Sequence, residues 1–472
     1  MAFLTEAANR GSISTGYDID NSLKFEADNS EYMHYTCSGQ TDYERMAYSV
    51  WLKRTELGTG QVFMEFGHGT ANTSNLRIGF DSSDRLFCYG NSIVWRQTNR
   101  VFRDTSAWYH LFFLFDTTTP GGVSNNRIRI WVNGEMIDHG DFGVINNPGA
   151  GSAMGFNNSL NHSIGRQTED ATAYFCGYMA QVYASGGTPP VVGDFAETDD
   201  NGIWVPIDIS EITPPDANGF NLDFSTSGSL GNDISSRNND FTLVNIAAAD
   251  QATDTPTNNF ATLNPLHTTT KYTITEGGTN QVSSANGWGS SVGSVGVTSG
   301  KWYFEVQSAD TNGYTLLGVI DEDSLLSIYI NGDAHAGDAP YGITYYGGNG
   351  SIITDGQAVS GVSFPSWTTE TMGCALDLDN NKIYFSKSGT YGNSGNPATG
   401  ANGLSLPTGG SGTWFISTST YYAASPAKTN QGGYTTNTIS SAATDANGYG
   451  TFEYAPPTGY YALCTKNLAE YG

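Results

Sequence analysis

The stretch that decides the fold of the second half of the chain is Gly373–Gly389, which reads GCALDLDNNKIYFSKSG. Two short runs of alternating apolar residues meet there at an Asp-Asn-Asn turn, a pattern that is typical of a β-hairpin. Two further strand-like segments precede the hairpin, Lys301–Val306 (KWYFEV) and Leu317–Ile320 (LGVI). These segments predict a domain built from β-strands in this part of the chain.

Composition extends this expectation to the whole chain, whose 472 residues are enough for two or three domains. Charged residues make up only 14%, aromatic residues make up 12%, and there are 58 glycines. Many glycines and aromatic residues suit short strands joined by many turns, and they argue against helix bundles. We therefore expect an all-β chain.

The formal net charge of -26 restricts the partners of the protein. Phosphate groups repel such a surface, so we expect no nucleic acid and no anionic membrane among its partners. No stretch reaches the roughly 20 consecutive apolar residues that a membrane helix needs, and Met1–Gly16 lacks the apolar core of a secretory signal. The sequence thus predicts a product assembled in the cytoplasm without membrane insertion.

The first half of the chain contains a second succession of strand-like segments. Trp108–Asp116 (WYHLFFLFD) is typical of a strand buried on both faces, and Arg127–Glu135 (RIRIWVNGE) of an alternating strand that ends in an Asn-Gly hairpin turn. Ser163–Arg166 (SIGR) and Tyr174–Tyr183 (YFCGYMAQVY) supply two closing strands. In these segments, residues 18–186 resemble the laminin-G-like, concanavalin A-like jelly roll.

The second half has a resemblance of its own. In their order and spacing, Lys301–Val306, Leu317–Ile320 and the hairpin at Gly373–Gly389 resemble the SPRY (B30.2-like) domain. This resemblance implies a β-sandwich over residues 263–472 whose loops bind and whose strands hold the loops. Together the two resemblances imply two β-sandwich (jelly-roll-like) domains joined by an irregular polar segment.

The joint between the domains is predicted within Ala247–Leu266 (AAADQATDTPTNNFATLNPL). Arginine is frequent up to Arg237 and does not occur after it, and the segment itself is polar, contains two prolines and shows no periodicity. The chain is therefore divided into an N-terminal anchor segment (1–17), the laminin-G-like jelly roll (18–186), an extension with the linker (187–262) and the SPRY-like domain (263–472).

Further segments resemble large virion proteins of tailed phages: Gly202–Pro206 (GIWVP), Asp254–Phe260 (DTPTNNF) and Ala455–Thr465 (APPTGYYALCT). The resemblance implies an adhesion protein of the virion, a tail fiber or surface appendage whose residues 1–17 meet the particle. Its implied partners are other virion proteins and host surface polysaccharide, and its implied assembly is a homo-oligomer, commonly a trimer. The alternative is a purely structural decoration or joining protein of the capsid or tail.

A third interpretation, an enzyme that degrades polysaccharide, is opposed by the placement of the acidic residues. Retaining glycan cleavage needs two carboxylates about 5 Å apart, which enzymes of this superfamily place alternately on one strand. No such strand occurs, since Glu197–Asp200 (ETDD) lies in a polar stretch and Asp321–Asp323 (DED) at a strand end. Acid clusters at turns are usually solvated, so we expect no enzymatic activity.

Calcium is a cofactor that laminin-G-like folds often hold, and loop carboxylates are its candidate ligands. They are Asp81, Asp84 and Asp116. Asp377–Asn381 (DLDNN) imitates the start of an EF-hand loop, but Lys382 stands where that loop requires glycine. This segment is therefore interpreted as a hairpin turn.

Aromatic residues in loops are the candidate carbohydrate-binding residues. Sugars present flat apolar faces edged with hydroxyl groups, so a binding site stacks Tyr or Trp on the face while Asn, Asp and backbone groups bind the hydroxyls. The candidates are Tyr345, Tyr346, Asn349, Tyr421, Tyr422, Tyr89 and Asn91. The alternative that stays open is that the tyrosines cap the sandwich core or pack against a neighbouring subunit.

Overall fold

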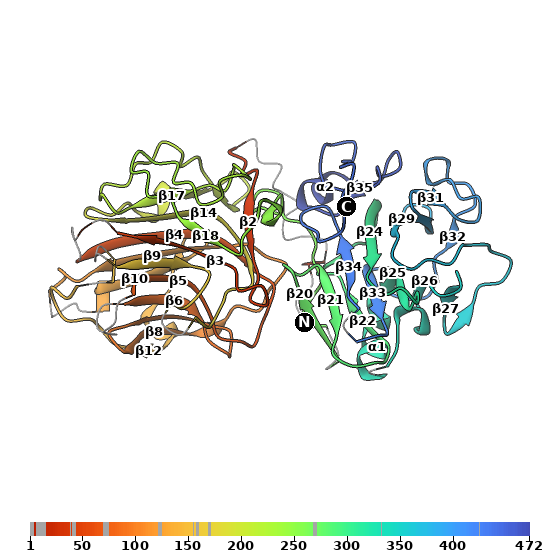
Figure 1. Ribbon diagram of the computed structural model, residues 1–472, viewed down its shortest axis with the longest axis horizontal. Helices are drawn as coiled ribbons and strands as arrows, with labels where there is room; N and C mark the ends of the chain where they lie inside the picture. Colours follow the sequence, from red (N-terminus) through yellow and green to blue (C-terminus); the bar gives the residue numbers. More distant parts are fainter. Residues whose placement is uncertain are drawn as a thin grey trace. The chain divides into compact units, whose positions relative to one another are not determined.

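The computed structural model describes residues 4–5, 16–37, 39, 44–68, 75–120, 125–153, 155–156, 160–168, 171–267, 271–331, 333–423 and 425–472. The chain divides into an N-terminal unit, Ser14–Thr257, and a C-terminal unit, Asn258–Gly472 with Met1–Ile13. Each unit is a β-sandwich, and the expectation of an all-β chain is confirmed (Figure 1). In the described part of the chain, no helix has the length and apolar character needed to cross a bilayer.

Two long antiparallel sheets form the N-terminal unit. The first sheet runs in the order β11 (Glu135–Met136), β10 (Ile128–Val132), β9 (Tyr109–Asp116), β4 (Arg45–Arg54), β14 (Gly177–Gly186), β2 (Ser22–Phe25) and β19 (Gln251–Ala252), and β17 (Phe220–Leu222) also pairs with β14. The second runs in the order β12 (Phe142–Ile145), β8 (Ile93–Val101), β7 (Arg85–Gly90), β6 (Leu76–Phe80), β5 (Gln61–His68), β13 (Asn161–Ile164), β3 (Tyr32–Thr36) and β18 (Thr242–Val244).

Strand β9 shows why both faces of the first sheet are apolar. Its Leu111 and Phe113 point into the core between the two sheets. The neighbouring Phe112 points to the opposite face, where it packs with Phe195 and Ile209 from the extension. The prediction of a strand buried on both faces is therefore confirmed, because successive strand residues point to opposite faces and both faces are covered.

The extension after β14 is part of the N-terminal sandwich. Its strands β17, β18 and β19 pair with β14, β3 and β2, and a two-stranded ribbon of β15 (Ala196–Thr198) and β16 (Trp204–Pro206) precedes them. Along the chain, the boundary between the two compact units falls between Thr257 and Asn258, inside the segment predicted as the joint. That segment is irregular, but it is not an exposed tether, since Asp254 and Thr255 are each only 1% exposed.

The C-terminal unit is a second sandwich. One sheet runs in the order β20 (Tyr272–Thr275), β21 (Asn280–Ser283), β34 (Ala427–Asn430), β24 (Lys301–Ser308), β29 (Thr371–Asp377), β30 (Lys382–Lys387) and β31 (Thr390–Tyr391), with β32 (Leu404–Ser405) on β30 and β35 (Tyr461–Ala462) on β24. The other runs in the order β22 (Gly289–Val292), β33 (Trp414–Thr420), β25 (Thr315–Asp321), β26 (Gly342–Tyr346), β27 (Ile352–Thr354) and β28 (Gln357–Ala358).

The hairpin at Gly373–Gly389 is present as the pair β29–β30. Its register runs from Met372 opposite Lys387 to Asp377 opposite Lys382. In the turn, Asn381 has a φ of 54° and the Asn380 backbone N–H donates to Asp377 Oδ1 at 3.0 Å. These contacts are those of a local hairpin turn, as the sequence predicts.

Shorter elements complete the C-terminal unit. They are the helices α1 (Leu325–Asn331) and α2 (Thr465–Tyr471) and the strand pair β1 (Leu4–Thr5) and β23 (Val295–Gly296). Strand β1 belongs to the predicted N-terminal anchor segment, and it pairs in parallel with β23. Most other residues of that segment lie outside the described ones.

Candidate functional site

Five aromatic residues lie at the same end of four neighbouring strands of one sheet, β22, β33, β25 and β26. Neighbouring strands in this sheet are antiparallel, so the start of one strand lies beside the end of the next. Trp288 directly precedes β22, Tyr421 and Tyr422 directly follow β33, Tyr314 directly precedes β25, and Tyr346 ends β26. We call these five residues the aromatic edge.

Backbone pairing continues past the strand ends and fixes the aromatic residues next to one another. Gly289 and Thr315 both lie opposite Thr420 in the register. Beyond them, the Gly287 N–H donates to the Tyr421 carbonyl at 2.9 Å and the Tyr421 N–H donates to the Tyr314 carbonyl at 3.1 Å. The aromatic edge is therefore held by the sheet itself.

The rings of the aromatic edge contact one another directly. The Trp288 ring centroid lies 5.3 Å from that of Tyr421, 5.8 Å from that of Tyr346 and 6.2 Å from that of Tyr314. Tyr422 joins through Tyr314, at 5.1 Å. Most of these pairs are edge-to-face, an arrangement that aromatic rings favour. All five residues are partly exposed.

Two carboxylates hold the loops that carry Tyr314 and Trp288. Asp310 accepts the backbone N–H of Tyr314 at 2.6 Å and that of Asn312 at 2.9 Å. Asp333 accepts the backbone N–H of Trp288 at 2.5 Å and lies 3.6 Å from the Lys271 ammonium. Both aromatic residues are thus positioned by charge-assisted hydrogen bonds to their backbone.

Glycines let the loop Gly347–Gly348–Asn349 approach its neighbours closely. A Cβ on Gly347 would lie 2.6 Å from the Gly313 carbonyl, and a Cβ on Gly348 would lie 2.6 Å from the Tyr346 hydroxyl. The exposed Asn349 turns its Oδ1 back to the Ser351 N–H at 2.9 Å. The loop therefore packs closely beside Tyr346.

The rings of the aromatic edge carry no charge, whereas three carboxylates lie around them. Burial and the neighbouring Tyr314 raise the pKa of Tyr346, so its hydroxyl stays protonated and can donate. Beneath Trp288, at 5.3 Å between centroids, lies His335, whose pKa is lowered by burial although Asp338 is only 3.4 Å away. Flat rings beside hydroxyl groups and polar loop atoms are the features that recognise saccharides.

The structure brings three of the predicted carbohydrate-binding residues together, Tyr346, Tyr421 and Tyr422. The prediction of Tyr345 as a carbohydrate-binding residue is wrong, because Tyr345 is fully buried and its hydroxyl donates to the Pro365 carbonyl at 2.5 Å. Strand alternation explains the difference, since consecutive residues of β26 point to opposite faces.

Trp288 and Tyr314 were not among the predicted residues. The available signal was an aromatic residue directly after a glycine at a strand start, as in Gly287–Trp288 and Gly313–Tyr314.

Tyr89 and Asn91 lie in the N-terminal unit, whereas the aromatic edge belongs to the C-terminal unit. Tyr89 is on β7, and the Arg77 guanidinium lies over its ring at 5.2 Å. Asn91 occupies the turn to β8 with a φ of 50°. Among the residues that the structure describes in this unit, no ring cluster of the kind around Trp288 includes Tyr89 or Asn91.

The three candidate calcium ligands do not form one site. Asp84 is paired with Arg54 at 3.1 Å and Arg103 at 2.7 Å. Asp81 is paired with Arg85 at 2.8 Å, and Asp116 lies at the end of β9 in the other sheet. In the part of the chain that the structure describes, no group of three His, Cys, Asp or Glu residues is arranged to hold a metal ion. We therefore place no calcium at these residues.

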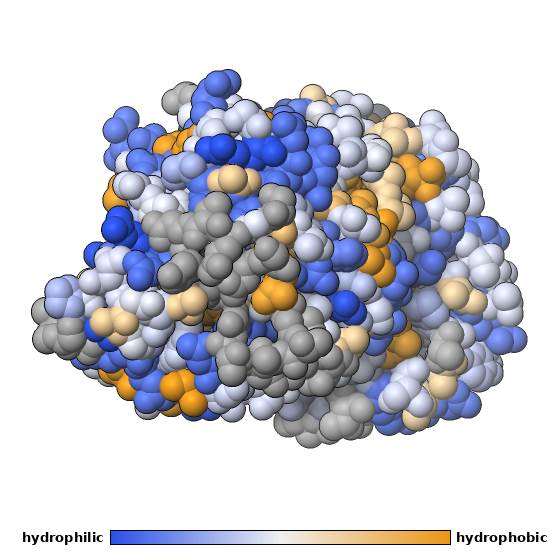
Figure 2. Space-filling view, turned by 60° about the vertical axis from the view of Figure 1, so that its left-hand side comes forward, coloured by the Kyte–Doolittle hydropathy of each residue, from blue (hydrophilic) through white to orange (hydrophobic). Residues whose placement is uncertain are grey.

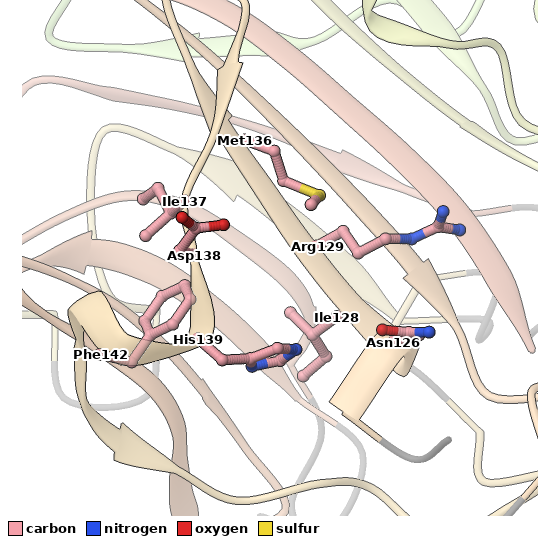
Figure 3. Close-up of a pocket in the computed structure, with 8 residues that line it drawn as sticks. All are labelled: Asn126, Ile128, Arg129, Met136, Ile137, Asp138, His139 and Phe142. Atoms are coloured by element: carbon pink, nitrogen blue, oxygen red, sulfur yellow. The ribbon is translucent and has the colours of Figure 1, made fainter.

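A small pocket lies in the N-terminal unit between β10, β11 and β12, and Figure 3 shows its lining. The lining residues are Asn126, Ile128, Arg129, Met136, Ile137, Asp138, His139 and Phe142. Its volume is about 70 Å³, well below the roughly 300 Å³ of the smallest typical ligand sites. In Figure 3 the Arg129 guanidinium extends away from Asp138, so the two charges do not converge on a ligand. The aromatic edge remains the stronger candidate.

Two families match the chain. Residues 27–188 match the concanavalin A-like lectin/glucanases superfamily, and residues 301–399 match the SPRY domain. No curated protein is similar enough to count as a match.

Solved structures also match parts of the chain. The SPRY domain of human HERC1 is 16% identical over 35% of this chain and 96% of its own, with a TM-score of 0.27. A further human SPRY domain is 14% identical over 34% of this chain and 94% of its own, with a TM-score of 0.26.

The third similar structure is a Bacteroides ovatus protein provisionally described as carbohydrate-binding. It is 16% identical over 48% of this chain, with a TM-score of 0.31, and the chain spans 58% of its length. Together with the two sandwiches, the family matches show that the chain contains a laminin-G-like domain of the concanavalin A-like superfamily followed by a SPRY domain.

Proposed function

We propose that this protein is an adhesion protein that binds host surface glycans, and that the aromatic edge of the SPRY domain is its binding surface. The observation that carries the proposal is the meeting of Trp288, Tyr314, Tyr346, Tyr421 and Tyr422, all partly exposed, at one edge of one sheet. Rings of this kind stack on the apolar faces of sugar rings, and the tyrosine hydroxyls pair with sugar hydroxyls.

The charge around the aromatic edge favours neutral sugars over acidic ones. Asp310, Asp333 and Asp338 all lie close to it, and the ammonium of Lys271 is already 3.6 Å from Asp333. With the net charge of -26, this surface repels carboxylate and sulfate groups. The proposed ligand is therefore an uncharged, hydroxyl-rich saccharide.

Figure 2 shows that the face turned to the viewer mixes hydrophobic with hydrophilic residues, the hydrophobic ones in separate spots and in one band. The proposal rests on the contacts among the five rings and not on this face.

The proposal is binding without cleavage. Glu197 lies on the exposed ribbon strand β15 of the N-terminal unit, whereas Asp321 is buried in the C-terminal unit. Asp321 accepts backbone N–H groups from Asp323 and Ser411 at 3.0 Å and from Gly412 at 2.8 Å. These contacts support a structural role for Asp321 rather than a catalytic one.

We further propose that the protein acts in a tailed-phage virion, as a tail fiber or surface appendage. This part rests on the resemblance of Gly202–Pro206, Asp254–Phe260 and Ala455–Thr465 to phage virion proteins. Single lectin-like sites bind weakly, and several linked copies raise avidity when they can bind together. A homo-oligomer would supply those copies, and other virion proteins would hold it on the particle.

The alternative is a decoration or joining protein in which the aromatic edge packs against another subunit. The observation that favours it is that the five rings already pack on one another, so only part of each is free. The position of the protein in a map of the whole particle separates the two roles, because adhesion needs the aromatic edge to face solvent.

The binding proposal is tested by titrating neutral oligosaccharides against the full chain and its Trp288→Ala variant. Trp288 contacts three of the four other rings, so its loss should weaken binding on the order of tenfold or more, which is about 1.4 kcal/mol. Tyr329→Ala is the matched control, because Tyr329 is 48% exposed on α1 and outside the aromatic edge. Equal loss in both variants would place the site elsewhere, and no binding by the parent chain would refute the function.

A further inference from the structure

Three charged side chains meet in the buried interior of the N-terminal unit. The Lys24 Nζ lies 2.8 Å from Glu31 Oε1 and 2.9 Å from Asp250 Oδ1. The three side chains are only 1%, 2% and 10% exposed, respectively. An amine in contact with two carboxyl groups, with little access to water, is an arrangement that can do chemistry as well as hold a fold.

The topology places these groups at the two ends of the unit. Lys24 is on β2 near the start of the sandwich, and Asp250 directly precedes β19, its last strand. Strands β2 and β19 are antiparallel neighbours with Leu23 opposite Gln251. The next position along this register sets Asp250 beside Lys24, so a bond between them would tie the last strand to the first.

The charges of the triad favour one protonated acid. Two ionised carboxylates and one ammonium would leave a net negative charge in a buried site, whereas one added proton makes the triad neutral. Burial raises the pKa of Glu31 to about 7, although the Lys24 ammonium opposes that shift. Glu31 Oε2 is buried without a hydrogen-bond partner among the described residues, so it is placed to carry that proton.

Asp250 is held and polarised as the acceptor. The backbone N–H of Ala247 donates to Asp250 Oδ2 at 2.8 Å, while Oδ1 faces the lysine. A backbone N–H on a carboxyl oxygen stabilises negative charge that develops there during attack by a nucleophile. The geometry therefore supplies a nucleophile, an acceptor, a proton carrier and a donor to the developing oxyanion.

We propose that Lys24 and Asp250 condense into a side-chain amide, with Glu31 as the proton carrier. The Lys24 ammonium first passes one proton to Asp250 Oδ1, 2.9 Å away, so that a neutral amine faces a neutral acid while Glu31 keeps its own proton. The Lys24 Nζ then attacks Asp250 Cγ and the Nζ–Cγ bond forms. Glu31 donates its proton to the departing Asp250 hydroxyl and takes one from Nζ, so the Cγ–O bond breaks and one water leaves. The amine and the acid thus become an amide and water, and no group is oxidised or reduced.

A second buried pair in the same unit provides an internal comparison. The Lys53 Nζ lies 2.7 Å from Asp254 Oδ2, and the two side chains are 0% and 1% exposed. The other oxygen of Asp254 accepts from the Trp108 indole N–H at 3.0 Å. Here an indole, which cannot carry a proton between the groups, stands where the triad has Glu31. We expect this pair to remain ionic.

The experiment is the intact mass of the purified full chain, followed by peptide mapping. The mass of the parent chain should be one water less than the mass calculated from its sequence. Trypsin should not cleave after Lys24, and the peptide that contains Lys24 should be released joined to the peptide that contains Asp250. Lys24→Arg keeps the positive charge but removes the amine, so its mass should equal its sequence. Asp254→Asn, the matched control, should keep the loss of one water.

Glu31→Gln tests the proton carrier. It should retain the full sequence mass in most molecules if Glu31 moves the protons. A folded parent chain at its full sequence mass would overturn the proposal, and this readout does not depend on how any variant folds. A lost water without a joined peptide would also overturn it, because the water would then have left another site.

Discussion

The indole N–H of Trp204 donates to Nδ1 of His110 at 3.0 Å, and this bond decides which nitrogen of the imidazole carries the proton. Because Nδ1 accepts, Nε2 is the protonated nitrogen and donates to the Ser49 hydroxyl at 2.9 Å. The imidazole is also stacked against Trp51, at 4.8 Å between centroids. A residue of the extension thus fixes a neutral histidine on the sheet that the extension covers.

Buried neutral histidines predict that acid destabilises the N-terminal unit. Burial lowers the pKa of His110 to about 3 and that of His162 to about 4, whereas each imidazole in the unfolded chain takes up a proton near about pH 6.5. Below about pH 6.5 the folded state binds fewer protons than the unfolded state, so the free energy of unfolding has its full value only above that pH. It falls toward pH 4 by about 1.4 kcal/mol per pH unit for each histidine.

Thermal melts between about pH 7.5 and about pH 5 measure this effect. His110→Gln should reduce the pH dependence of the melting temperature by the share of one histidine. His139→Gln is the control, because His139 is exposed and its loss leaves the core untouched. Parallel pH profiles for His110→Gln and the parent chain would contradict the assignment.

The ion pairs of Asp84 predict very unequal effects for its two arginines. Burial acts to raise the pKa of Asp84, but hydrogen bonds from Gly58 and Arg103 and the charge of Arg54 outweigh it, so the pKa is lowered. Arg54 is fully buried, whereas the Arg103 side chain is 52% exposed.

Asp84→Asn leaves the Arg54 charge buried without its counter-ion, and it should lower the free energy of unfolding by about 3–5 kcal/mol. Arg103→Ala removes only an exposed partner and should cost less than about 1 kcal/mol. Denaturant unfolding of the N-terminal unit distinguishes the two variants. Similar costs for both would mean that Asp84 is not the counter-ion of Arg54.

Much of the fold could be predicted because its signals are local. The hairpin at Gly373–Gly389 and the Trp108–Asp116 strand are decided by alternation and turn residues within each segment. The aromatic edge depends on which strands become neighbours. Trp288 and Tyr421 meet only because β22 pairs with β33, and Tyr345 and Tyr346 look alike until the register of β26 decides which one is buried.

The polar segment before the SPRY domain shows the same limit. Asp250 and Asp254 give Ala247–Leu266 the composition of an exposed linker. In the structure these two acids are the buried partners of Lys24 and Lys53. Nothing in the local pattern reveals an ion pair between residues more than 200 positions apart. The sequence therefore predicts an exposed linker, whereas the segment completes the first sandwich.

The loop glycine beside Tyr346 predicts a variant that affects binding more than folding. A methyl group on Gly348 would come within 2.6 Å of the Tyr346 hydroxyl, and Gly348 is exposed, so the ring can move aside. Gly348→Ala should weaken glycan binding on the order of fivefold, which is about 1 kcal/mol, and it should leave the melting temperature of the C-terminal unit nearly unchanged. An unchanged affinity would exclude Tyr346 from the binding surface.

The final prediction concerns where the first sandwich ends. A fragment of residues 14–257 keeps β19, Asp250 and Asp254, and it should unfold in a single cooperative transition. A fragment that ends at Ile246 leaves the fully buried Lys53 without its carboxylate. One uncompensated buried charge costs about 3–5 kcal/mol, a large part of the roughly 5–15 kcal/mol that stabilises a domain. The shorter fragment should therefore be unfolded or melt far lower.

The matched control for that comparison is the longer fragment with Asp254→Asn, which keeps β19 but removes the charge. Its melting temperature should lie between those of the two fragments, because only one of the two lost contributions is missing. Equal melting temperatures for the fragments that end at Ile246 and Thr257 would contradict this prediction. They would mean that residues 247–257 can be removed without exposing strand β2 and without leaving a buried lysine unpaired, as expected of a flexible linker.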